Sequence, residues 1–189
     1  MTRPVLALCL ALGWLAGCAS SPTPSLYVLQ PVAGPVKQTR VMNVELRRIS
    51  LAGYLDRPEM VRGPRDYRLS VDSNARWAEP LGGMLERVLT EDLVQRLPQA
   101  AVFAEAGAIS TRPDLVLELD VQRLDSDAEG HVVVLAQVAL RPEGGVARAT
   151  TLRLRQDIGG VGSPADQAAA ISAVIGSLAD EIGARVAGF

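Results

Sequence analysis

Apolar and polar residues alternate along three segments in the second half of the chain. These are DLVLELDVQRL (114–124), HVVVLAQVALR (131–141) and ARATTLRLRQD (147–157). Alternation with a period of two is typical of strands that bury one face. The intervening stretches DSDAEG and PEGG have the composition of hairpin turns. The pattern therefore predicts three consecutive strands paired antiparallel.

Two other segments repeat their apolar residues every three or four positions, which predicts amphipathic helices. The first begins beside Pro80 and ends before Pro98. The second begins after Ser163, with Pro164 at the first helical position and Asp166 placed to complete a capping box. The residues expected to face the core are Leu81, Met84, Leu85, Val88, Leu89, Leu93 and Leu97, then Ile171, Ile175, Leu178, Ile182 and Val186.

Shorter extended segments occupy the first half of the chain. LYVLQ (26–30) and TRVMNVELRRISL (39–51) predict strands, and EMVR and DYRLSV predict short strands joined by turns. Together the elements predict one α+β domain over residues 26–189. We expect a mostly antiparallel sheet of about five to seven strands with the two amphipathic helices packed on one face.

One predicted strand is apolar on both faces. One side carries Val132, Val134, Ala136, Val138 and Leu140, and the other carries Val133 and Leu135. Such a strand is either covered on both sides within its own chain or buried against a partner subunit. We expect the chain to form a homo-oligomer.

The start of the chain has the features of a lipoprotein signal peptide. Arg3 precedes an apolar run over residues 5–15, which is too short to span a bilayer. Leu-Ala-Gly then leads directly to Cys18, the pattern at which bacteria cut a lipoprotein and attach lipid to the cysteine. The alternatives are a plain signal peptide with an incidental cysteine, or an uncleaved anchor.

We therefore predict a cleaved segment 1–17, a lipidated tether 18–25, and covalent diacylglycerol and N-acyl (palmitate) chains on Cys18. Three acyl chains would fix the protein permanently to a membrane. Ala19 follows the cysteine, whereas aspartate there favours retention at the inner membrane. We expect the protein on the periplasmic face of the outer membrane.

Composition narrows the classes of partner and cofactor. Without residues 1–17 the chain keeps 18 basic and 21 acidic residues, a balance that does not indicate nucleic-acid binding. Cys9 lies in the predicted signal peptide and Cys18 carries lipid, so no cysteine remains for a disulfide. Apart from the lipid we expect no cofactor.

No local motif indicates catalysis or metal binding. The chain has no nucleophile elbow, phosphate-binding loop or zinc motif. Its one histidine, His131, opens a strand directly after a turn, which is typical of a surface residue. We predict that the protein is not an enzyme, with no catalytic residues and no metal ligands.

Two segments, 49–62 and 74–81, interrupt the alternation with charged and large residues: Tyr54, Asp56, Arg57, Arg76, Trp77 and Glu79. Tyrosine, tryptophan and arginine are enriched at binding hot spots, which makes these residues candidates for a partner interface. The alternative is a role in the fold, with Asp56 and Arg57 capping turns and Trp77 packing under the first helix.

These segments carry a resemblance to a known family. YLDRPEMVR, followed by RWAEPLGGMLERVLTEDLVQRLP, after the lipobox and a short YVLQP strand, resembles the ABC-type transport auxiliary lipoproteins of the PqiC/YmbA type. Tyr54, Asp56, Arg57, Pro58, Arg76, Trp77 and Glu79 match the family pattern. The resemblance implies an accessory subunit that serves with an ATPase, a permease and an MCE-domain periplasmic protein in moving lipids or other apolar molecules.

The sequence thus leaves three functional hypotheses. The first is a non-enzymatic lipoprotein that docks the MCE protein of such a transport system. The second is a stand-alone periplasmic carrier that holds lipid between its sheet and its helices. The third is a structural lipoprotein that braces the envelope, although no peptidoglycan-contacting motif is present.

Overall fold

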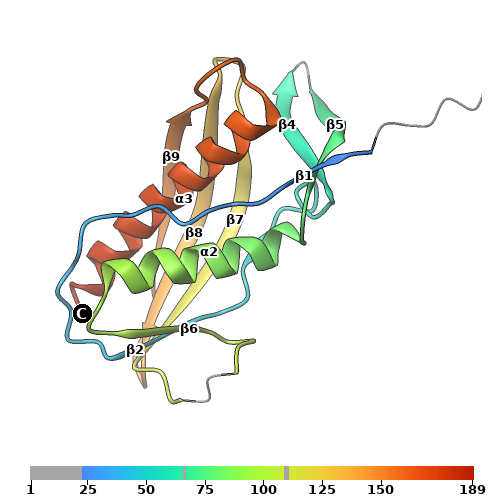
Figure 1. The fold of residues 1–189 in the computed structure, drawn as a ribbon. Helices are drawn as coiled ribbons and strands as arrows, with labels where there is room; N and C mark the ends of the chain where they lie inside the picture. The colour runs from blue at the N-terminus through green and yellow to red at the C-terminus, as the bar shows by residue number, and fades with distance from the viewer. Residues whose placement is uncertain (1–22, 66, 109–110) are drawn as a thin grey trace, which may run out of the picture.

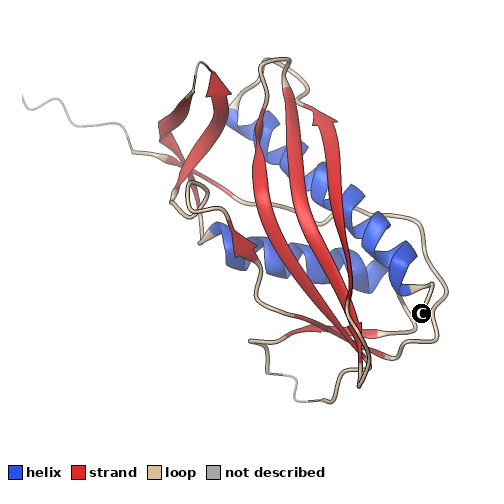
Figure 2. Cartoon of the chain, turned by 180° about the vertical axis from the view of Figure 1, so that it is seen from behind, coloured by secondary structure: helices blue, strands red, loops and turns tan. Residues whose placement is uncertain are grey.

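The protein folds as a layer of two helices on one face of a mixed sheet (Figures 1 and 2). The computed structural model describes residues 23–65, 67–108 and 111–189. Helices α2 (Leu81–Arg96) and α3 (Pro164–Val186) pack together over the larger sheet. That sheet has the order β6-β2-β7-β8-β9, with β3 paired to β7. Its strands are β2 (Asn43–Leu46), β3 (Ser50–Leu51), β6 (Ala101–Ala104), β7 (Leu115–Ser126), β8 (His131–Pro142) and β9 (Arg148–Asp157).

A second, three-stranded sheet stands beside the first. It has the order β1-β5-β4 and consists of β1 (Ser25–Tyr27), β4 (Glu59–Arg65) and β5 (Arg68–Trp77). Strands β4 and β5 form a hairpin that projects at the end of the molecule where α3 begins (Figure 1). Glycine is required at one contact of this hairpin. A Cβ atom on Gly63 would lie 1.7 Å from the backbone oxygen of Ser126 in β7.

The α+β class and the two helices are confirmed, and the strands form mixed sheets that are not purely antiparallel. The three long strands β7, β8 and β9 pair antiparallel, as do β4 and β5. In contrast, β2 runs parallel to β6 and β7, β3 runs parallel to β7, and β1 runs parallel to β5. Parallel pairing requires long connections, and α2 forms part of the one between β2 and β6. The expected strand over 39–51 is two short strands, and β6 was not predicted.

A bulge in β7 accounts for part of the doubly apolar strand β8. The register shifts between Val121 and Arg123, so Leu124 turns to the helix side and Asp125 to the far side. Asp125 lies opposite Val133, which is buried. The hydroxyl of Tyr54 donates to Asp125 at 2.6 Å. The far face of the sheet is therefore covered locally by the chain itself at this end.

The core lies between the larger sheet and the helices, where every helix residue expected to face inward is buried. Leu117 of β7, Val134 of β8 and Leu178 of α3 have no solvent exposure. The predicted capping box is confirmed at the start of α3. The Ser163 backbone N–H donates to the Asp166 carboxylate at 2.9 Å, and the Asp166 N–H donates to the Ser163 hydroxyl at 3.2 Å.

Residues 28–40, here called the strap, connect β1 to β2 across the two helices (Figure 1). The Gln30 N–H donates to the Ser172 hydroxyl of α3 at 3.1 Å. The Val32 N–H donates to the Asp92 carboxylate of α2 at 2.7 Å, and the Lys37 N–H donates to a carbonyl of α2 at 2.7 Å. The strap thus uses its backbone to join both helices.

Arg96 lies at the centre of this arrangement and is 1 % exposed. Its guanidinium donates to the Asp180 carboxylate at 2.6 Å and to the carbonyl oxygens of Val32, Asp92 and Gly176 at 2.9 to 3.0 Å. One buried cation therefore joins the strap, α2 and α3. Burial raises the pKa of the neighbouring Asp92 carboxyl, against the opposing effects of the Val32 N–H and Arg96.

The predicted signal peptide, the lipid attachment site Cys18 and most of the predicted tether lie outside the described residues. Within the ranges that the structure describes, neither helix is long and apolar enough to cross a membrane.

Candidate functional site

The two segments selected from the sequence meet in space at the amino-terminal end of α2. They line a shallow hollow of about 340 Å³, formed by Asp56, Arg57, Pro58, Trp77, Ala78, Glu79 and Pro80 and here called the Trp77 hollow. The Trp77 N–H donates to the Pro58 carbonyl at 2.7 Å. The next N–H, of Ala78, donates to the Tyr27 carbonyl of β1 at 2.9 Å. Backbone bonds therefore fix the two segments against each other.

Trp77 contributes mainly to the core beneath this hollow. The residue is 6 % exposed and packs with the buried residues under α2, as the structural alternative from the sequence expected. Asp56, Arg57 and Pro58 are exposed around it. The hollow thus combines a rigid aromatic base with charged side chains at the surface, an arrangement found at protein interfaces.

Ion pairs order the charges around the hollow. Arg57 and Arg76 both approach the Glu59 carboxylate, at 3.4 and 3.6 Å, and Arg87 of α2 contacts Glu79 at 2.7 Å. Exposed ion pairs contribute little to stability, typically below about 1 kcal/mol. Their effect here is to present both signs of charge on one surface, which favours a partner with a complementary charge pattern.

Tyr54 is the one sequence-selected residue that points to another part of the fold. It is half-buried, and its hydroxyl donates to Asp125 on the far face of the larger sheet. Burial raises the pKa of Tyr54, and the hydrogen bond to the Asp125 carboxylate raises it further. Arg123 contacts the other oxygen of Asp125 at 2.8 Å. Tyr54 therefore secures the bulged end of β7.

A second hollow adjoins the first and was not foreseen from the sequence. It has a volume of about 360 Å³ and shares Asp56 and Pro80 with the Trp77 hollow. Its other lining residues are Arg48, Ile49, Leu51, Gly82, Gly83, Glu86 and Ala106. The two hollows form one surface around the start of α2, called below the α2 surface. Only the small residues at 82 and 83 hinted at this opening in the sequence.

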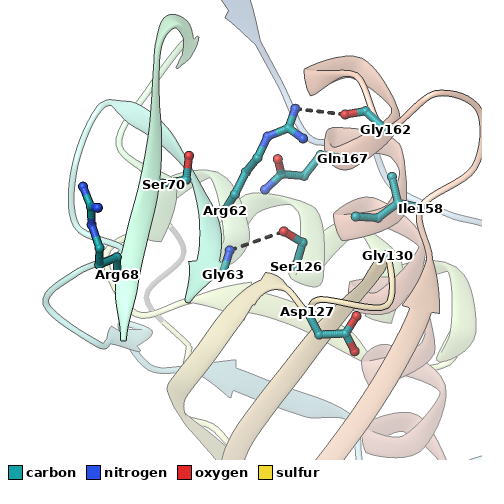
Figure 3. Close-up of a pocket in the computed structure, with 10 residues that line it drawn as sticks. All are labelled: Arg62, Gly63, Arg68, Ser70, Ser126, Asp127, Gly130, Ile158, Gly162 and Gln167. Carbon is teal, nitrogen blue, oxygen red and sulfur yellow. Dashed lines mark hydrogen bonds between the residues drawn. The ribbon is translucent and has the colours of Figure 1, made fainter. Parts of the chain in front are cut away.

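A third hollow, larger than these two, lies between the β4–β5 hairpin and the start of α3 (Figure 3). This hairpin pocket has a volume of about 470 Å³. Arg62 reaches across it to donate to the Gly162 carbonyl at 2.9 Å, and Gln167 donates to the Val61 carbonyl at 2.7 Å. These bonds attach the hairpin to α3 and to the loop before it. The pocket therefore lies at the boundary between the two sheets.

His131 lies beside this pocket in a cluster with Asp127 and Glu129, whose possible ligand atoms lie within 4.8 Å of one another. Burial opposes ionisation of Asp127, but hydrogen bonds from His131 and Arg155 hold its pKa well below the usual range. Arg155 also lies 3.5 Å from Glu129. A metal ion would have to displace this guanidinium, so the cluster acts as an ion-pair network.

Comparison with known proteins identifies the family. The model of the ABC-type transport auxiliary lipoprotein component matches residues 27–183, which is most of the chain. The chain belongs to this family. The resemblance read from the two segments around the Trp77 hollow is thereby confirmed. No curated protein sequence matches the chain.

Two solved structures share the fold. One is an uncharacterised protein with 20% sequence identity and a TM-score of 0.69, and the match covers 87% of this chain and 99% of that one. The other is a protein of Xanthomonas campestris assigned to the family DUF330, with 19% identity and a TM-score of 0.63. That match covers 88% of this chain and 95% of the relative. At these identities the likeness extends to the fold alone.

Proposed function

We propose that the protein is a non-enzymatic outer-membrane lipoprotein that docks the periplasmic MCE-domain protein of an ABC transport system for lipids or other apolar molecules. Membership of a family of auxiliary transport lipoproteins supports the accessory role. The observation that carries the docking step is that segments 49–62 and 74–81 meet on the α2 surface.

The lipid anchor is supported by the sequence before the described residues. Cys18 follows a branched residue and two small ones, and a stretch rich in serine and proline separates it from Ser25. Such a stretch behaves as a tether. Attachment to the membrane confines the domain near its partner and raises the effective concentration of the docking surface. A shallow contact then suffices for stable assembly.

The α2 surface suits a protein partner better than a small molecule. Its two hollows are shallow, of about 340 and 360 Å³, and adjoin each other. Arg57 is exposed at the edge of the Trp77 hollow, and the buried Trp77 forms its base. Arginine beside a buried aromatic residue is a frequent hot-spot arrangement, in which loss of one side chain costs about 2 kcal/mol or more of binding.

The test is an affinity pull-down from detergent-solubilised membranes with the lipidated protein as bait. Arg57→Glu reverses a charge on the α2 surface, and Arg112→Glu is the matched control because Arg112 is also exposed and lies in the β6–β7 connection. We expect the wild type and the control to recover an MCE-domain protein and Arg57→Glu to lose it. Failure of the folded wild type to recover such a protein after cross-linking would remove the proposal.

The carrier hypothesis needs a lipid cavity between the sheet and the helices. That space is filled by side chains such as Met84, Val88 and Leu117, none of which is exposed. A carrier would have to open this packed core. Mass spectrometry of lipid extracted from the purified domain tests the carrier hypothesis, because a carrier retains lipid in near-stoichiometric amount.

The expected homo-oligomer is a separate prediction, and light scattering measures the oligomeric state.

A further inference from the structure

An unusual number of apolar side chains is exposed on and beside the smaller sheet. Tyr67 is fully exposed in the turn before β5, and Leu69 and Val71 of β5 are also exposed. Across the hairpin pocket, Val161 is almost fully exposed in the loop before α3. Tyr67, Leu69, Val71 and Val161, with the exposed Arg68, are here called the hairpin end. Exposed apolar groups gathered at one end of a protein usually mark a contact surface.

Tyr67 is held in a conformation that keeps it in this position. Its φ is 63°, and apart from four glycines it is the only residue with positive φ in the described part of the chain. The left-handed region is unfavourable for a residue with a Cβ atom, because the Cβ approaches the following carbonyl. The backbone at Tyr67 is therefore strained, and its side chain is fully exposed. A contact with a partner outside the chain would offset this strain.

The described chain begins beside β5, the strand that leads out to the hairpin end. Strand β1 runs parallel to β5, with Ser25 opposite Ala75. Ala75 is seven residues beyond Arg68 along β5, and Ser25 is seven residues beyond Cys18. A chain of seven residues spans at most about 25 Å. The tether is thus about as long as the part of β5 that leads out to the hairpin end.

We propose that the hairpin end rests on the phospholipid bilayer in which the Cys18 lipid is embedded. The inference rests on the proposed lipid anchor. Tyrosine is favoured at the membrane interface because its ring is apolar and its hydroxyl stays hydrated. Leu69, Val71 and Val161 enter the boundary of the acyl chains, and Arg68 meets lipid phosphates. The contact fixes the orientation of the domain on the membrane, which a flexible tether alone does not.

The same orientation suits the α2 surface. Strands β4 and β5 lead from the hairpin end back toward the start of α2, where Trp77 closes β5 and Leu81 opens the helix. The α2 surface therefore lies at the base of the hairpin, while the carboxyl terminus lies at the opposite end of the molecule (Figure 1). A domain standing on its hairpin end keeps the α2 surface clear of the bilayer and open to a periplasmic partner.

The test places an environment-sensitive nitrobenzoxadiazole label on the intact lipidated protein. Once Cys18 carries lipid and residues 1–17 are removed, a new cysteine is the only free thiol. Tyr67→Cys and Leu69→Cys report on the hairpin end, and Val146→Cys is the control because Val146 is also an exposed apolar residue but lies in the β8–β9 turn. The vesicles contain phosphatidylethanolamine and phosphatidylglycerol.

We expect the label at 67 and at 69 to shift its emission to the blue and to lose quenching by iodide, while the label at 146 stays quenched. A protein that floats with vesicles but keeps both hairpin labels quenched overturns the inference and leaves the anchor intact. A protein that carries no lipid by intact mass and does not float overturns the anchor as well. Protection that persists in a chain lacking residues 1–18, without vesicles, assigns the hairpin end to a second copy and also overturns the inference.

Discussion

Replacing Arg96 by methionine tests whether one buried cation joins the strap to the helices. Methionine preserves much of the volume and the unbranched shape of the side chain but removes all its hydrogen-bond donors. The change leaves the Asp92 carboxylate, which is 0 % exposed, without a neighbouring cation. It also leaves the carbonyl oxygens of Val32 and Gly176 without their guanidinium donor.

The expected loss of stability follows from these contacts. Removing one partner of a buried ion pair costs about 3–5 kcal/mol, because the remaining charge is uncompensated. A domain of this size is stable by about 5–15 kcal/mol, so Arg96→Met removes a large fraction of the free energy of unfolding. Replacing Asp92 by leucine in the same chain removes the orphaned charge. The double variant should therefore recover part of the loss.

The loss of stability caused by Arg96→Met should also depend on pH. Burial raises the pKa of Asp92 above its unfolded value, and Arg96 opposes this rise. Without Arg96 the folded pKa rises further. A carboxyl group whose pKa is higher in the folded chain than in the unfolded chain stabilises the fold at pH values below the unfolded-chain pKa. This contribution is lost as pH rises through the folded-chain pKa. The deficit of Arg96→Met should thus be larger at neutral than at acidic pH.

Urea unfolding of the chain from residue 19 onward, followed by circular dichroism, gives the free energies by linear extrapolation. Arg185→Met is the control, because within the described residues the Arg185 side chain donates only to Glu181, one helical turn before it. A loss at Arg96 no larger than at Arg185, or a double variant less stable than the single one, would refute the reasoning.

Three further substitutions test other contacts by the same unfolding assay. Tyr54→Phe removes the hydroxyl bonded to buried Asp125 and should cost about 1–2 kcal/mol, whereas no loss would show that the bond is dispensable. Gly63→Ala places a methyl group 1.7 Å from a backbone oxygen of β7 and should cost about 3 kcal/mol; a neutral result would contradict the close approach. Ser163→Ala should cost about 1 kcal/mol at neutral pH. The Ser163 N–H and hydroxyl both donate to the Asp166 carboxylate and lower its pKa, and only the hydroxyl is lost in the variant. The part of the cost that comes from the hydroxyl–carboxylate bond should therefore be lost as pH falls through the lowered pKa, while the part that comes from the Asp166 N–H bond remains; a cost that does not fall would contradict the hydroxyl–carboxylate bond.

Helices and long strands were predictable because their signals are local. The spacing of apolar residues marked α2 and α3, and Ser163, Pro164 and Asp166 marked the start of α3. The β7–β8 and β8–β9 hairpins followed from turn residues between alternating segments. Short connections leave antiparallel pairing as the simplest outcome. Each of these elements is decided within about 25 residues of sequence.

Pairing between distant strands was not predictable. Strand β6 has four residues and pairs with β2, which lies almost 60 residues earlier. So short a segment has no pattern that indicates which strand it pairs with or whether the pairing is parallel. The bulge near Val121 likewise shows in the sequence only as a change of phase at Leu124. The apolar far side of β8 therefore left two explanations open, cover within the chain or a partner subunit, and at the bulged end of β7 Tyr54 and Arg123 of the same chain contact Asp125.

The candidate site was found through residue type and not through periodicity. Arg57 and Trp77 stood out because they interrupt the alternation in a chain with few aromatic residues, and the fold brings their segments together. The role of Arg96 was missed, because an arginine near the end of an amphipathic helix is ordinarily exposed. Only its position four residues after Asp92 was visible in the sequence.

Arg96 also bears on how a lipid anchor can orient a folded domain. The predicted tether precedes β1, and the strap follows β1, so any force on the proposed lipid at Cys18 would reach the body through β1 and the strap. β1 has only three residues paired with β5 and would yield easily alone. The strap adds backbone bonds to both helices, secured by a buried guanidinium. The proposed anchor would therefore be coupled to the rigid helical layer, and with the hairpin end as a second proposed point of contact, the domain would be held on the membrane in one orientation.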